Sequence, residues 1–254
     1  MHLQLDRVSK VFGQGASSKL VLEDISFQIK PGEFVALVGS SGSGKSTVMR
    51  LVAGLERPTA GAVLVDGQPV RGPGSDRGMV FQKYSLYPWL TAAQNVAFGM
   101  ELKGRGRAEI RERTAYFLEV VGLAGSAALY PRELSGGMQQ RVSICRALIY
   151  DPELLLMDEP FGALDAMTRE DLSFELLRIW DERKKTVVFV THSIAEAVLL
   201  ADRVIVMTAR PGKVVMDVPI TLPRPRTPDT EFTPEFSEFA KTIRAAVYAE
   251  ARGG

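Results

Sequence analysis

The chain has 254 residues, of which 46% are hydrophobic and 24% are charged, a balance that is ordinary for a globular protein and excludes extensive disorder. Its 31 basic and 30 acidic residues leave too little net charge for a general attraction to nucleic acid or anionic lipid. No hydrophobic run reaches the length of about 18 residues that spans a membrane, and the single cysteine excludes an internal disulfide. We therefore expect a protein of a reducing, aqueous compartment.

The first third of the sequence is rich in predicted β-strands. Alternating or short hydrophobic runs predict strands at 2–8, 22–29, 34–39 and 62–67. The run at 34–39 ends in glycine, which is typical of a buried strand that leads into a phosphate-binding loop. A helix is then predicted from Lys45 to Gly54, because Pro58 beyond it prevents a longer helix.

The middle of the chain changes to helical periodicity and then returns to strands. Helices are predicted at 92–102, at 107–123 and after the "LSGG" of 134–137. Strands are predicted at 153–158, 186–191, 203–208 and 213–220, and helices between them near 166–182 and 193–201. Strands that alternate with helices indicate an α/β fold whose mainly parallel sheet is covered on both faces.

The last part of the chain predicts an extended connector and one more helix. Prolines are frequent from 223 to 234, after which Thr233 can cap a helix that has Pro234 at its first position. The residues that share one face of this helix are Phe236, Phe239, Ile243 and Val247. We expect this face to pack on the chain's own domain, the alternative being a helix that binds a partner.

The sequence "GSSGSGKST" at 39–47 fits the spacing G-x-x-x-x-G-K-[ST] between a strand and a helix, the context that a phosphate-binding loop requires. Its glycines let backbone N–H groups converge on phosphate oxygens, and the helix N-terminus adds a favourable partial charge. Lys45 is predicted to reach the β and γ phosphates, Ser46 to bind Mg²⁺ and Thr47 to donate to a phosphate. The predicted ligand is a nucleoside triphosphate with magnesium, bound by Gly39, Ser40, Ser41, Gly42, Ser43, Gly44, Lys45, Ser46 and Thr47.

Two adjacent acidic residues follow the hydrophobic run of "LLLMDEP", at the sheet edge where ligands of parallel sheets bind. Asp158 is expected in the magnesium shell. Glu159 is expected to point the other way, because strand neighbours alternate, and to orient and deprotonate a water. The alternative is that the pair only ends a strand before Pro160. His192 ends the next strand, and we expect it to contact the γ phosphate or orient the water, rather than to be an ordinary loop residue.

Six stretches resemble, in order and spacing, the nucleotide-binding subunits of ABC transporters. They are "GSSGSGKST" at 39–47, "VFQ" at 80–82, "LSGGMQQR" at 134–141, "LLLMDEP" at 154–160, "GALD" at 162–165 and "VTH" at 190–192. The resemblance covers residues 1–222 and implies an ABC-type P-loop ATPase domain. Within it, the family pattern implies an N-terminal antiparallel β subdomain and a helical subdomain inserted at about 84–150. Residues 223–254 would form the connector and the C-terminal amphipathic helix.

The resemblance also implies roles for residues outside the phosphate loop. Gln82 would touch Mg²⁺ and the attacking water and link the two subdomains, and Phe12 would stack on adenine. Asp165 would belong to a loop that communicates across a dimer. Without the resemblance, Gln82 could equally well be a polar residue at a strand end, and Phe12 could equally well be an aromatic residue of the core. Phe12 stands where many members have tyrosine, Gly162 where many have serine and Met138 where many have glutamine, which puts the strength of those contacts in doubt.

The "LSGG" stretch implies a second half of the nucleotide site. In this family each ATP lies between two subunits, so Ser135, Gly136 and Gly137 would donate to the γ phosphate bound by a second copy of the chain. Two copies related by a two-fold axis would then complete two sites. The alternative is that Ser135 is an ordinary helix cap.

Several large hydrophobic residues follow Gln82 and could form a groove for a helix of a membrane permease. They are Tyr84, Leu86, Tyr87, Trp89 and Leu90. The alternative is that they pack the helical subdomain.

The residues in and around these motifs are similar to those of the importer branch for nitrate, sulfonate and taurine. That branch implies an ATP hydrolase with Lys45, Gln82, Glu159 and His192 in catalysis, located at the cytoplasmic face of the inner membrane. Its partners would be a second copy, permease subunits and indirectly a solute-binding protein, with no nucleic acid. The alternatives are a soluble ABC ATPase acting on nucleic acid and a regulatory interaction protein.

Overall fold

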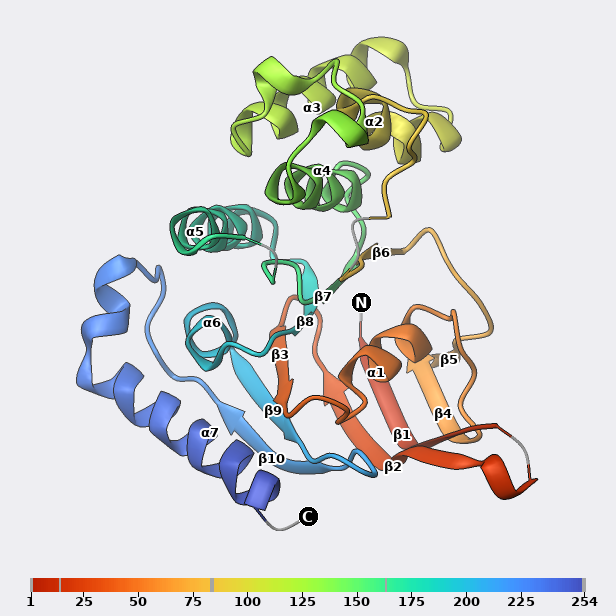
Figure 1. The fold of residues 1–254 in the computed structure, drawn as a ribbon, viewed down its shortest axis with the longest axis vertical. Coiled ribbons are helices and arrows are strands. Elements are labelled where there is room, and N and C mark those ends of the chain that lie inside the picture. The colour runs from red at the N-terminus through yellow and green to blue at the C-terminus, as the bar shows by residue number, and fades with distance from the viewer. Residues whose placement is uncertain (1, 14, 83–84, 163, 253–254) are drawn as a thin grey trace.

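The strands of the chain form two separate β-sheets, one of four strands and one of six, in the part that the structure describes. This computed structural model describes residues 2–13, 15–82, 85–162 and 164–252. Figure 1 shows the two sheets in the lower part of the molecule and a group of helices above them. The separation explains why the first third of the sequence is strand-rich while the later strands alternate with helices.

The smaller sheet is antiparallel and has the strand order β2-β1-β4-β5. Its strands are β1 (Leu3–Phe12), β2 (Lys19–Ile29), β4 (Ala60–Val65) and β5 (Gln68–Pro69). A short 3-10 turn at Gly15–Ser17 lies between β1 and β2. β1 extends beyond the strand predicted at 2–8, because it continues its pairing with β2 as far as Phe12.

The larger sheet has the order β10-β9-β3-β8-β7-β6, and all its neighbours are parallel except β10, which is antiparallel to β9. Its strands are β3 (Phe34–Gly39), β6 (Arg77–Val80), β7 (Leu154–Asp158), β8 (Thr186–Val190), β9 (Arg203–Met207) and β10 (Val214–Pro219). The mainly parallel α/β sheet and the antiparallel β subdomain that the sequence predicted are thus confirmed.

Strand β3 is hydrophobic throughout because both faces of its sheet are covered. Phe34, Ala36 and Val38 join a core that includes residues of α5 (Ala166–Arg183) and α6 (Ile194–Leu200). Val35 and Leu37 face the opposite way, into a core shared with α1 (Lys45–Val52) and the antiparallel sheet. This alternation holds the end of β3, and the loop that follows it, in a fixed position.

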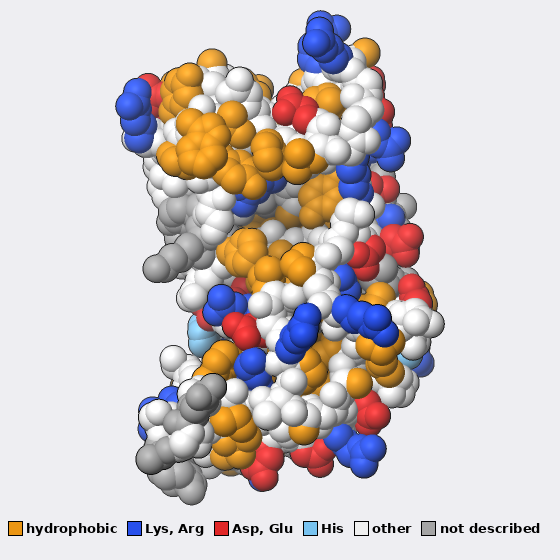
Figure 2. All heavy atoms as spheres, turned by 90° about the vertical axis from the view of Figure 1, so that its right-hand side faces the viewer, with side chains coloured by type: hydrophobic (Ala, Val, Ile, Leu, Met, Phe, Trp, Pro, Cys, Tyr) orange, Lys and Arg blue, Asp and Glu red, His pale blue; other side chains and the backbone are white. Residues whose placement is uncertain are grey.

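The helical part above the sheets consists of α2 (Ala92–Leu102), α3 (Arg107–Val120) and α4 (Gly136–Leu148), with 3-10 turns at Ala124–Ser126 and Pro131–Glu133. The predicted helix at 107–123 ends earlier, because Gly122 adopts a φ of 67°. Figure 2 shows hydrophobic side chains gathered around a hollow on one face of the molecule. No helix among the described residues is both long and hydrophobic enough to cross a membrane.

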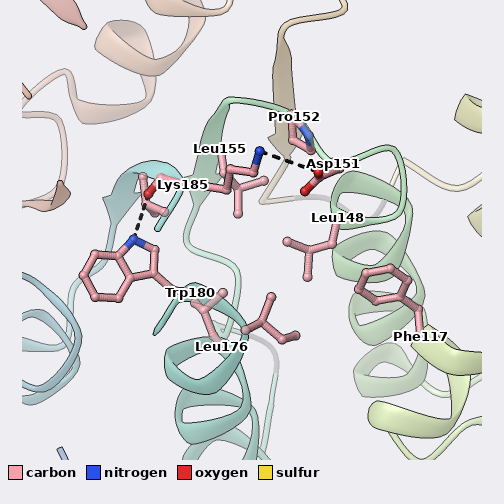
Figure 3. Close-up of a pocket in the computed structure, with 10 residues that line it drawn as sticks. Phe117, Leu148, Asp151, Pro152, Leu155, Leu176, Trp180 and Lys185 are labelled. Carbon is pink, nitrogen blue, oxygen red and sulfur yellow. Dashed lines mark hydrogen bonds and ion pairs between the residues drawn. The ribbon is translucent and has the colours of Figure 1, made fainter. Parts of the chain in front are cut away.

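A small hydrophobic cavity of about 30 Å³ marks the junction between the helical part and the larger sheet. Figure 3 shows Phe117 of α3 and Leu148 of α4 facing Leu176 and Trp180 of α5 across this cavity. The indole Nε1 of Trp180 donates to the carbonyl oxygen of Lys185 at 2.7 Å. The helical part therefore rests on α5 through hydrophobic side chains.

The C-terminal helix α7 (Pro234–Arg252) packs against the rest of the chain, as the sequence predicted. The Thr233 side chain accepts from the N–H of Phe236 at 3.2 Å and so caps its first turn. Phe236 and Ile243 are buried, and Phe239 and Val247 pack against the same core. Before α7 a 3-10 turn runs over Pro228–Phe232. The division at residue 222 stays a prediction.

Arg226 of the proline-rich connector holds this segment to the end of α6. It is 5% exposed, and its Nη1 donates to the carbonyl oxygens of Val198, Leu199 and Ala201 at 3.1, 2.8 and 2.7 Å. Burial lowers the pKa of Arg226 to about 10, so the guanidinium stays charged at neutral pH. A cation is favourable at a helix C-terminus, where carbonyl groups lack partners within the helix.

Arg226→Met is expected to lower the free energy of unfolding by about 1–3 kcal/mol, the usual cost of leaving buried polar groups unpaired. Denaturant unfolding monitored by circular dichroism would measure it. Arg244→Met is the matched control, because Arg244 is an exposed arginine of α7. Equal stability of the two variants would contradict the anchoring role of Arg226.

Candidate active site

The loop between β3 and α1 brings the backbone close to the antiparallel sheet. Gly44 precedes α1 with a φ of 84°, a left-handed conformation that L side chains rarely adopt. A Cβ at this position would lie 2.4 Å from Cδ2 of Leu22, so only glycine fits. Ser41, Gly42 and Gly44 of this loop line an open pocket next to the sheet.

Lys45 is buried beneath this loop and is 5% exposed. Its Nζ donates to the carbonyl oxygens of Gly39 and Ser40 at 2.9 and 3.1 Å and to Oγ of Ser43 at 3.2 Å. Burial lowers the pKa of Lys45, and the nearby carboxylate of Glu159 acts in the opposite direction. The loop thus holds a cationic donor at its centre, where a phosphate group would need one.

Ser46 and Asp158 form the oxygen pair next to the loop. Asp158 is the last residue of β7 and is 6% exposed, and the Ser46 hydroxyl donates to its Oδ1 at 3.1 Å. Burial raises the pKa of Asp158, while the hydrogen bond from Ser46 lowers it. A hydroxyl and a carboxylate are the hard oxygen ligands that Mg²⁺ prefers, so the donor set fits that ion.

Glu159 is held between Gln82 and His192. Nε2 of Gln82 donates to Oε2 of Glu159 at 2.9 Å, and Nε2 of His192 lies 2.5 Å from Oε1. The expected strand alternation does not apply to Glu159, because β7 ends at Asp158 and Glu159 has a left-handed φ of 49°. Strand alternation therefore does not set the direction of the Glu159 side chain, which lines the same pocket as Lys45 and Ser46.

These groups surround one open pocket of about 340 Å³ at the carboxyl edge of the larger sheet. The residues that line it are Lys19, Leu20, Val21, Ser41, Gly42, Gly44, Lys45, Ser46, Thr47, Gln82, Glu159, His192 and Arg210. Sequence reasoning missed Lys19, Leu20, Val21 and Arg210, because no local pattern marks the start of β2 or the turn between β9 and β10. Only the folded chain brings those segments to the phosphate loop.

Phe12 lies beside the pocket but does not line it. It pairs with Lys19 at the end of β1 and is 37% exposed. Nζ of Lys10 lies 4.6 Å from the centroid of the Phe12 ring, an arrangement that favours a cation over one ring face. Stacking of Phe12 on adenine stays a prediction.

The "LSGG" residues and Asp165 lie outside the pocket of their own chain. Ser135 caps α4 by accepting from the N–H of Met138 at 3.3 Å, and Gly136 and Gly137 form its first turn. Asp165 caps α5 by accepting from the N–H of Thr168 at 3.0 Å, and that backbone hydrogen bond lowers the pKa of Asp165. The helix cap that the sequence analysis gave as the alternative for Ser135 is thus present. The role of Ser135, Gly136, Gly137 and Asp165 toward a second copy stays a prediction.

Comparisons with known proteins agree with this geometry. A family model described as ABC transporter matches residues 22–162. The chain is 48% identical to the nitrate import ATP-binding protein NrtD of Synechocystis sp., over 96% of this chain and 94% of the relative. It is 42% identical to the aliphatic sulfonates import ATP-binding protein SsuB of Bacillus cereus, over 96% and 94%.

Solved structures give the same result for the fold. The chain is similar to the ATP-binding cassette MJ0796, solved as a dimer in a post-hydrolysis state bound to ADP and Pi, with a TM-score of 0.79 and 36% identity. That similarity covers 87% of this chain and 99% of the other. The family match, the two relatives and the shared fold show that the chain belongs to the ABC transporter family, as an ATP-binding subunit that hydrolyses ATP.

Proposed function

We propose that the chain powers a membrane importer of small solutes of the nitrate, sulfonate or taurine type. The support is similarity over nearly the whole chain to proteins named as nitrate and aliphatic sulfonates import ATP-binding proteins. These names favour an importer over a soluble ABC ATPase acting on nucleic acid and over a regulatory interaction protein. The chain would act as a peripheral subunit at the cytoplasmic face of the inner membrane, with a solute-binding protein as an indirect partner.

A second copy of the chain would complete each ATP site. Ser135, Gly136 and Gly137 form the N-terminus of α4 and lie outside the pocket of their own chain. Exposed N–H groups at a helix N-terminus attract anions such as phosphate. A two-fold axis would place each α4 against the ATP of the partner, and the similar cassette MJ0796 is described as dimeric.

Mg²⁺ would bind beside the phosphate loop, with Ser46 and Asp158 as ligands and Gln82 as a third. The hydrogen bond of 3.1 Å between Ser46 and Asp158 brings their oxygens together. Nε2 of Gln82 donates to Glu159, so the amide oxygen of Gln82 would be its ligand atom. The bound ion supplies charge neutralisation for the phosphates, while Lys45 and the loop residues hold them.

The connection between ATP and the permease would run through two adjacent residues. Gln82 lines the ATP pocket, and Phe81 lines a second cavity of about 600 Å³ between the helical part and the sheet. This adjacency supports coupling between the two cavities, because a change in the position of Gln82 would act directly on Phe81 in the wall of the second cavity. Tyr84, predicted for this groove, lies outside the described residues.

The second cavity has the properties of a groove for a short amphipathic helix. Tyr87 and Phe98, whose ring centroids are 4.6 Å apart, and Leu102, which is 74% exposed, form a hydrophobic wall. Lys103 and Arg146 add positive charge. Figure 2 shows such a hollow bordered by hydrophobic side chains. A permease helix with a hydrophobic face and an acidic residue would fit this groove.

Leu102→Asp is expected to reduce transport by on the order of tenfold, because burying a leucine side chain is worth about 1.5–3 kcal/mol and 1.4 kcal/mol is about tenfold. The measurement is uptake of nitrate, an aliphatic sulfonate or taurine by liposomes that contain a permease of this class, its solute-binding protein and ATP. ATP binding by the isolated chain uses the other cavity and should not change.

Tyr248→Asp is the control, since Tyr248 is 61% exposed on α7, far along the chain from the groove. If this variant loses uptake and Leu102→Asp does not, the C-terminal helix and not the groove contacts the partner. If no tested solute stimulates ATP turnover in the liposomes, the proposed solute class is wrong.

A further inference from the structure

The turn between β9 and β10 is fixed against the ATP pocket by its backbone. The N–H of Gly212 donates to the carbonyl oxygen of Val21 at 2.9 Å, and the N–H of Glu23 donates to the carbonyl oxygen of Gly212 at 3.0 Å. A Cβ at Gly212 would lie 2.2 Å from the carbonyl oxygen of Ser43. The turn therefore fits between β2 and the phosphate loop without space for a side chain at Gly212.

Internal hydrogen bonds hold the shape of this turn. The Thr208 hydroxyl donates to the carbonyl oxygen of Pro211 at 3.0 Å and accepts from the N–H of Lys213 at 2.9 Å. Arg210 lies in the middle, with a φ of 62°, a conformation that is uncommon for a residue other than glycine. The result is that the Arg210 side chain lines the mouth of the ATP pocket.

The guanidinium of Arg210 forms no hydrogen bond or ion pair with the residues that the structure describes. Two other basic side chains near this turn do have partners. Nζ of Lys213 lies 3.0 Å from Oε2 of Glu23, and Nε of Arg203 lies 2.9 Å from Oδ1 of Asp217. A charged donor that lines a ligand pocket without a protein partner is free to bind the ligand.

The position of the turn indicates which end of the ATP molecule Arg210 contacts. Glu159 contacts both Gln82 and His192, and these three residues form the catalytic side of the pocket. The turn is instead bonded to β2, whose residues Lys19, Leu20 and Val21 form another side of the pocket. Lys45 already supplies the buried cation for the phosphates. Arg210 therefore belongs to the side of the pocket that remains for the base and ribose.

We propose that Arg210 is a further ATP-binding residue that contacts the nucleoside end of ATP. A guanidinium is planar, so it can stack on the face of an adenine ring while its in-plane N–H groups remain free to donate to ribose hydroxyls. Lysine offers a compact charge and cannot stack in this way. The inference rests on ATP binding at this pocket and adds a residue to it.

Arg210→Gln and Arg210→Lys should each bind ATP about two- to fivefold more weakly than the wild type, a typical loss for one exposed cation–π contact. Isothermal titration calorimetry with ATP measures the dissociation constants. Competition by inorganic tripolyphosphate, which has no base or ribose, measures the phosphate contacts separately. Tripolyphosphate affinity should be equal in the wild type and both variants.

Lys213→Gln is the matched control, because it removes a basic side chain from the same turn, and its ATP affinity should equal that of the wild type. Unchanged ATP affinity in the two Arg210 variants would overturn the assignment. An equal loss for ATP and tripolyphosphate would place Arg210 on the phosphates and overturn the nucleoside contact. Failure of the wild type to bind ATP would instead contradict the function of the pocket as a whole.

Discussion

Replacing Glu159 by glutamine is expected to slow ATP hydrolysis by about 10²- to 10⁴-fold, the usual loss when a general base is removed, while ATP binding is retained. Glutamine has almost the same shape as glutamate, and its amide still forms hydrogen bonds. It has no carboxylate to accept a proton from the attacking water. The expected result is therefore a chain that binds ATP normally and cleaves it very slowly.

The geometry of the site gives the reason for this expectation. Gln82 donates to one oxygen of Glu159, and His192 lies 2.5 Å from the other, so the carboxylate has a fixed orientation at the pocket wall. A water between Glu159 and the γ phosphate would be held in line for attack while the carboxylate accepts its proton. Lys45 and the loop N–H groups would stabilise the charge that develops on the phosphate oxygens.

Steady-state phosphate release measures the turnover of Glu159→Gln, and size-exclusion chromatography with ATP measures its oligomeric state. Because hydrolysis would normally separate two copies, the variant should accumulate as ATP-bound dimers. Glu153→Gln is the matched control, since Glu153 is an exposed carboxylate just before the same strand, β7. Unchanged turnover in Glu159→Gln would exclude Glu159 as the general base.

Much of the site could be predicted because its information is local in the sequence. The phosphate loop depends on spacing within nine residues, and Asp158 follows from the end of a hydrophobic strand. Gln82 was predicted only from the resemblance, since the short strand β6 (Arg77–Val80) that carries it to the site has no clear pattern of its own. The residues of such local motifs could therefore be assigned to the site from the sequence.

Other features depend on backbone geometry and tertiary contacts that no local pattern encodes. Glu159 lies beyond the end of β7 and has a left-handed φ, so strand alternation could not predict the direction of its side chain. Arg210 reaches the pocket because the β9–β10 turn is bonded to β2, about 190 residues away in the chain. The groove beside Phe81 combines residues of two subdomains, so its shape follows only from their packing.

Lys45→Ala is expected to weaken ATP binding by about 10- to 100-fold. A hydrogen bond to a charged group is worth about 1.5–3 kcal/mol, and each 1.4 kcal/mol is about tenfold in affinity. Lys45 is 5% exposed, and its ammonium group is already surrounded by three oxygen acceptors. Water screens such a buried charge poorly, so its attraction to phosphate is stronger than that of a surface lysine.

Comparison with Lys19→Ala shows whether the effect of Lys45→Ala on ATP affinity depends on the buried position of Lys45 or only on the loss of one positive charge. Lys19 also lines the pocket but is exposed, so Lys19→Ala removes the same charge from the solvent side and should cost far less affinity. Calorimetric titration with ATP measures both variants, and thermal unfolding checks that Lys45→Ala remains folded without the hydrogen bonds to Gly39 and Ser40. If both lysines contribute equally, or if Lys45→Ala binds ATP like the wild type, the loop does not hold the triphosphate in the way that its buried ammonium predicts.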